Sequence, residues 1–143
     1  MNPLKRLEIV KESTLDTQKV IQELFEFTRT QQSNAKELAE HFGSKNLSEV
    51  KKTRDRLKKQ IQHEKDLMKR VESILNKQEI ILRQEWMSNH SGIAYEIRSL
   101  LDSISDQNSS IRILKTMLVS LELRIDRLEK NYLKGSRTSA WFK

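Results

Sequence analysis

The chain has 143 residues, of which 33% are charged and 36% hydrophobic, and its formal net charge is +7. This length suits one ordinary domain, and three glycines with one proline are too few for a turn-rich β-sandwich or barrel. Without cysteine the chain has no disulfide framework and no zinc–thiolate site. The composition is typical of long helices with narrow apolar stripes, so we expect an all-α fold.

Glycines divide the chain into three helical segments of similar length. Gly43, Gly92 and Gly135 each follow a long stretch with helical periodicity, and glycine commonly ends a helix. Asn2 followed by Pro3 is a suitable pair for a helix cap and first turn. The predicted helices span about 3–42, 46–87 and 93–134.

The first segment keeps heptad spacing, but its seam is partly polar. Four of its ten seam positions are Thr or Gln, and two phenylalanines widen the face near the middle. We interpret it as a helix that packs on the other two segments or on a partner. Its seam positions are Val10, Thr14, Thr17, Ile21, Leu24, Thr28, Gln31, Ala35, Leu38 and Phe42.

The middle segment has a second heptad register, which Arg54, Glu64 and Gln78 interrupt. Extra apolar residues flank this seam toward its end, which is the widening expected where two helices pack near a turn. The seam positions are Leu47, Val50, Arg54, Leu57, Ile61, Glu64, Met68, Val71, Leu75, Gln78 and Leu82.

The stretch 88–92 is a hairpin turn or a stutter in one long helix, because the middle and last registers are offset there. The widened faces on both sides favour the hairpin. The polar stretch 103–110 is a competing turn, although the heptad register passes through it undisturbed. We expect Trp86 to fill the end of the hairpin core rather than to bind a ligand.

The last segment has the clearest coiled-coil periodicity, with twelve positions in alternating steps of four and three from Ile93 to Tyr132. Its second half places Ile at position a and Leu at position d, a combination that favours two parallel strands. We therefore predict a self-association or partner seam made of Ile111, Leu114, Leu118, Leu121, Ile125, Leu128 and Tyr132.

Positive charge is concentrated in residues 51–70, where nine basic residues stand against three acidic ones, a net charge of +6. One interpretation is a surface for nucleic acid or another polyanion. The alternative, which we favour at this point, is a solvated helix face supported by intrahelical pairs Asp55–Lys59 and Asp66–Arg70. The candidate polyanion-binding residues are Lys51, Lys52, Arg56, Lys58, Lys59, Lys69 and Arg70.

The segment 135–143 follows the last glycine and carries basic residues without an acidic one. We expect a flexible basic tail outside one elongated helical domain over 1–134. Arg137, Trp141 and Phe142 are candidates for a docking motif, since aromatic residues beside basic ones are common anchors in partner grooves. The alternative is that these aromatics fold back onto the bundle.

Catalytic and metal-binding motifs are missing from the sequence. His41, His63 and His90 are far apart and form no zinc motif, and neither a phosphate loop nor a dinucleotide-binding glycine pattern occurs. Thin helices with narrow stripes rarely enclose the dry pocket that catalysis requires. We expect no enzymatic activity, no cofactor and no metal.

No stretch is apolar and long enough for a membrane span, and the first ten residues lack the apolar core of a signal peptide. We therefore expect an intracellular protein, cytoplasmic or nuclear. The predicted function is a structural or adaptor subunit that oligomerises through coiled-coil helices, joins other protein subunits and scaffolds a multiprotein assembly. The alternative is a nucleic-acid-binding or packaging protein that uses residues 51–70 and the tail.

Overall fold

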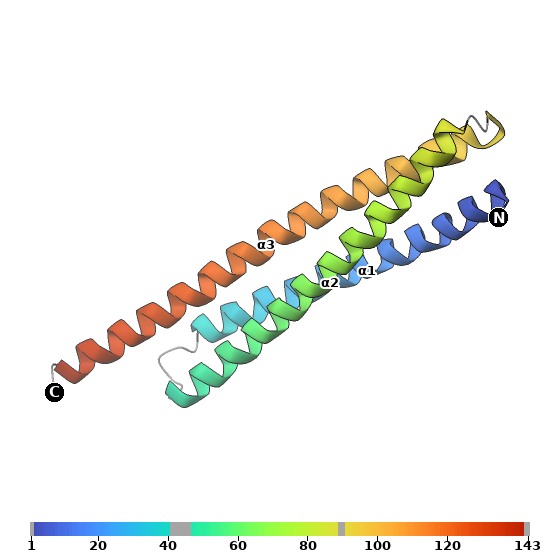
Figure 1. Ribbon diagram of the computed structural model, residues 1–143. Coiled ribbons are helices and arrows are strands. Elements are labelled where there is room, and N and C mark those ends of the chain that lie inside the picture. The colour runs from blue at the N-terminus through green and yellow to red at the C-terminus, as the bar shows by residue number, and fades with distance from the viewer. Residues whose placement is uncertain (1, 41–46, 89–90, 142–143) are drawn as a thin grey trace.

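The computed structural model describes residues 2–40, 47–88 and 91–141; at 47, 91, 129 and 131–141 it describes the backbone alone. Its elements are α1 (Pro3–Glu40), α2 (Leu47–Met87), the short 3-10 helix η1 (Ser91–Ile93) and α3 (Ala94–Trp141). The three long helices pack against one another as an elongated bundle (Figure 1). The all-α prediction of three long helices is confirmed, and no strand occurs in the described ranges.

Helix α1 begins at the predicted cap. The backbone N–H of Leu4 donates to the side-chain Oδ1 of Asn2 at 3.0 Å, and the N–H of Arg6 donates to the Asn2 carbonyl at 3.1 Å. Pro3 occupies the first helical position, where its missing N–H costs no intrahelical hydrogen bond. The cap therefore fixes the start of α1 by local chemistry alone.

Helices α2 and α3 form a hairpin, as the sequence favoured, rather than one continuous helix. Lys115 Nζ lies 2.6 Å from Glu72 Oε1, and Lys58 Nζ lies 3.0 Å from Asp126 Oδ1. The residue that comes earlier in α2 pairs with the residue that comes later in α3, so α3 is antiparallel to α2. The turn residues 89–90 lie outside the described residues, and the competing turn at 103–110 is wrong because α3 passes through it unbroken.

The hydrophobic core is a continuous seam between the three helices. Every described position of the three predicted seams is buried or partly buried, and Phe42, Leu47 and Tyr132 lie outside the described side chains. The largest fully buried apolar side chains are Leu57, Ile61, Leu75, Leu82, Ile97, Ile104, Ile111, Leu114, Leu118, Leu121 and Ile125.

A polar layer crosses this core near its middle and ties α1 to both other helices. Thr17 Oγ1 donates to Gln107 Oε1 at 2.6 Å, and Gln107 Nε2 donates to the Thr14 carbonyl at 3.0 Å. From α2, Gln78 Nε2 donates to Ser13 Oγ. Polar side chains that interrupted the predicted seams thus meet one another, which satisfies hydrogen bonds that burial would otherwise leave unmade.

Helix α3 is longer than predicted. Its backbone continues through Gly135 to Trp141, so the predicted end at residue 134 is wrong. Glycine inside a helix costs only about 1 kcal/mol relative to alanine, which is too little to end a helix without a further signal. No proline follows Gly135 to add that signal.

Candidate binding surfaces

The predicted partner seam of α3 faces its own bundle. Ile111, Leu114, Leu118, Leu121 and Ile125 are each at most 2% exposed within the single chain. Leu128 is partly buried, and the side chain of Tyr132 lies outside the described set. The prediction that this seam binds a second copy is therefore corrected, because α1 and α2 of the same chain supply the apolar surface that we assigned to a partner.

The basic residues of 51–70 are on the surface of α2. All seven candidate residues are exposed, and Lys58 is the one among them with a cross-helix ion pair, to Asp126. The intrahelical pairs that would support a merely solvated face do not form among the described residues. Asp55 instead accepts hydrogen bonds from Arg54 at 2.8 and 3.1 Å, and Asp66 accepts one from Gln62 at 3.2 Å.

Charge differs between the three helices. Helix α1 has six basic against seven acidic residues, whereas α2 has eleven against seven and α3 eight against six. One of the acidic residues in α2, Glu64, lies inside the core at 1% exposure and does not offset the surface charge. The outer surface of α2 is therefore the most cationic face that a described helix presents.

Glu64 belongs to a second polar layer rather than to a reactive site. Its Oε1 accepts a hydrogen bond from Thr28 Oγ1, while its buried Oε2 has no hydrogen-bond partner among the described residues. Burial raises the pKa of the Glu64 carboxyl above its ordinary value, and the Thr28 hydrogen bond offsets part of this rise. A carboxyl enclosed on all sides cannot meet a substrate, so its effect is on stability.

Between the described helices, three hollows open at the end of the bundle where the N-terminus of α1 lies near the start of α3 (Figure 1). The hollow between α1 and α2 is lined by apolar Ile9 and Ile81 and by the ion pair of Arg6 with Glu85. Glu85 occupies a core position here, so an ionic contact replaces one apolar layer.

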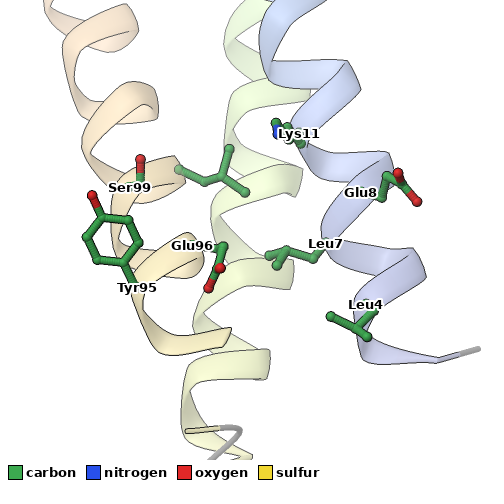
Figure 2. A pocket seen from close by; sticks show the side chains of 8 residues that line it. Leu4, Leu7, Glu8, Lys11, Tyr95, Glu96 and Ser99 are labelled. Carbon is green, nitrogen blue, oxygen red and sulfur yellow. The ribbon is translucent and has the colours of Figure 1, made fainter. Parts of the chain in front are cut away.

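The hollow between α1 and α3 is shown in Figure 2. Leu4 and Leu7 come from α1, with Leu7 pointing toward α3, and Tyr95 and Glu96 come from α3. Tyr95 is mostly exposed, and the charged residues Glu8, Lys11 and Glu96 line the opening. This hollow combines an apolar floor with an edge of mixed charge.

The hollow between α2 and α3 has a volume of about 470 Å³ and contains Trp86, which is 50% exposed. Beside it, Met87 is 84% exposed, and Leu101 contributes from α3. The expectation that Trp86 fills the core end is therefore wrong. Its place at the last turn of α2 lies outside the seam, whose core position there belongs to Glu85.

Arginines flank this α2–α3 groove. Arg83 and Arg98 line it together with a single acidic residue, Asp102, and Arg83 is held by Glu79 one turn away at 2.9 Å. Trp, Met and Arg are the residue types enriched in protein–protein interfaces. Sequence reasoning missed this groove because its residues come from two helices whose registers must be aligned before they meet.

The candidate tail residues cannot be placed in a site. The backbone of Arg137 and Trp141 is helical, their side chains lie outside the described set, and Phe142 lies outside the described residues. The docking tail stays a prediction.

Comparisons with protein-family models, with curated proteins and with solved structures gave no match. Among the described residues, none of the helices has a stretch long and apolar enough to cross a membrane. Nor do three or more His, Asp or Glu side chains of this part of the chain gather where they could hold a metal ion.

Proposed function

We propose that the protein is a non-enzymatic adaptor subunit that binds a helix of another protein in the groove between α2 and α3. One observation carries this proposal: Trp86 and Met87 are exposed beside Leu101 in a hollow at the end of the bundle. Large apolar side chains that are adjacent and exposed commonly mark interaction sites. Oligomerisation through the α3 seam is not part of the proposal, since that seam is buried.

The charge of the groove indicates which kind of partner helix it binds. Arg83 and Arg98 line the groove against one acidic residue, Asp102, and Arg98 has no ion pair among the described residues. An amphipathic helix with an apolar stripe and flanking Asp or Glu complements this surface. We therefore assign the groove to an acidic amphipathic helix of a partner protein.

Trp86 provides a direct assay, because the chain has only two tryptophans. In a Trp141→Phe variant, the fluorescence of Trp86 alone would report on the groove. The probes are two designed helical peptides with the same leucine stripe, one flanked by Glu and the other by Lys. We expect saturable binding and a blue-shifted emission with the Glu peptide, and much weaker binding with the Lys peptide.

Variants on that background test the location. Met87→Ser and Arg98→Gln should each weaken binding of the Glu peptide, by about tenfold or more for an interface anchor. The control is Leu123→Ser, which removes an exposed apolar side chain from α3 outside the groove. Equal weakening by the control, or equal affinity for both peptides, would refute the proposed groove.

A further inference from the structure

A cationic stripe runs along the outward face of α2. At about 100° per residue, Lys51, Lys52, Lys59, Lys69, Arg70 and Lys77 fall within one arc of about 100°. The buried positions of α2 centre on the opposite side of the helix, so this arc faces away from the bundle. All six residues are exposed. Lys77 extends the stripe beyond the range in which sequence composition alone placed the charge.

The acidic residues near this stripe do little to neutralise it. Asp55 is bound by the guanidinium of Arg54, and Glu64 is inside the core. Asp66 stays on the arc, where its hydrogen-bond donor is the amide of Gln62. None of the six basic side chains has an ion pair among the described residues, so their charge is available to a partner.

We propose that this stripe binds the phosphate backbone of double-stranded nucleic acid without sequence preference. It has two groups, one of Lys51, Lys52 and Lys59 and one of Lys69, Arg70 and Lys77. Each group extends over about 10–12 Å of helix, which is close to the width of the major groove of roughly 12 Å. Each can therefore contact phosphates on both edges of a groove.

The chemistry of the stripe favours a duplex over other polyanions. Five of its six residues are lysines, which are compact charges suited to contact with phosphates. No aromatic side chain lies on the arc between Lys51 and Lys77, and single-strand binders need aromatic platforms for stacking. The same arc lacks the apolar residues that an interfacial membrane helix inserts. This inference is independent of the proposed adaptor groove.

The test is fluorescence anisotropy with a labelled DNA duplex of roughly 20 base pairs, about two helical turns. The variant carries Lys51→Gln, Lys59→Gln, Lys69→Gln and Lys77→Gln, all on the stripe. The matched control carries Lys5→Gln, Lys11→Gln, Lys19→Gln and Lys36→Gln, which lowers the net charge equally from exposed positions on α1. Circular dichroism checks that both variants keep the helical fold.

We expect the wild type and the α1 control to bind the duplex with similar affinity at low salt. The stripe variant should bind at least tenfold more weakly at about 50 mM salt, and its log–log salt slope should be shallower by about three to four units. Three results would overturn the inference: no duplex binding by the wild type, an equal loss in the α1 control, or binding to a single strand or to phosphatidylserine vesicles that is as tight as binding to the duplex.

Discussion

Replacing Glu64 with glutamine should stabilise the protein at neutral pH. The Glu64 side chain is 1% exposed, and within the described part of the chain one of its two carboxylate oxygens is buried without a hydrogen-bond partner. Glutamine has the same shape and keeps an oxygen that can accept the hydrogen bond from Thr28. It removes the buried charge and adds an N–H donor beside Thr28, which precedes Gln31 by one helical turn on α1; the buried Oε1 of Gln31 also has no donor among the described residues.

The expected gain in unfolding free energy equals the cost of leaving one buried polar group without a hydrogen bond, about 1–3 kcal/mol. At about 2.1 cal/mol/K of unfolding entropy per residue, a chain of 143 residues converts this gain into a rise of roughly 3–10 °C in Tm. The control is Glu23→Gln, which removes an exposed carboxylate from α1 and should change the Tm by less than about 2 °C.

The pH dependence of the unfolding free energy tests whether the buried charge of Glu64 destabilises the fold. The pKa of the Glu64 carboxyl is raised in the folded protein. The stability that the protonated carboxyl contributes is therefore fully present below its ordinary pKa of 4.5 and is lost as pH rises through the folded-state pKa. The variant does not titrate at this position. The difference in unfolding free energy between variant and wild type, measured by urea denaturation, should be larger at pH 7 than at pH 4. A variant that is less stable than the wild type at pH 7, or a difference that does not change with pH, would refute this reasoning.

Three other substitutions test the packing. Leu121→Ala should lower the unfolding free energy by about 2–5 kcal/mol, and the thermal midpoint should not depend on protein concentration. A midpoint that depends on concentration would show that the α3 seam binds a partner chain. Gln107→Leu should cost less than about 1 kcal/mol in urea denaturation, because the Thr17 hydroxyl can then donate to the Thr14 carbonyl, 3.0 Å away. A loss above about 2 kcal/mol would mean that the polar layer itself stabilises the fold. Gly92→Ala should raise the unfolding free energy by about 0.4–1 kcal/mol in calorimetry, since no atom of the described residues lies within 4 Å of the added Cβ. A loss would show that this glycine is required.

The sequence could predict the seams because burial in a helix repeats every three or four residues. This held even where the seam residues were polar, as at Thr14, Gln78 and Gln107, since spacing and not residue type marks the buried side. The cap at Asn2 was equally local and equally predictable.

The partner of each seam could not be predicted in the same way. Ile111 and Leu121 have the pattern of a two-stranded coiled coil, but helices of the same chain offer the same apolar complement as a second copy would. Whether such a seam packs within its own chain or on a second copy depends on how the heptad registers of the three helices align. The groove at Trp86 depends on the same alignment, because Leu101 and Arg98 reach it from another helix.

The polar layer at the middle of the core also bears on the order of assembly. Contacts between α2 and α3 next to their turn close small loops, whereas Thr17 of α1 and Gln107 of α3 are 90 positions apart in the chain. In this layer Ser13 and Thr17 of α1 contact Gln78 of α2 and Gln107 of α3, so the layer is complete only when α1 packs on both other helices. Helix α1 should therefore dock last onto a preformed α2–α3 hairpin and leave first. Native-state amide exchange would show this as α1 opening at a lower free energy than the other two helices.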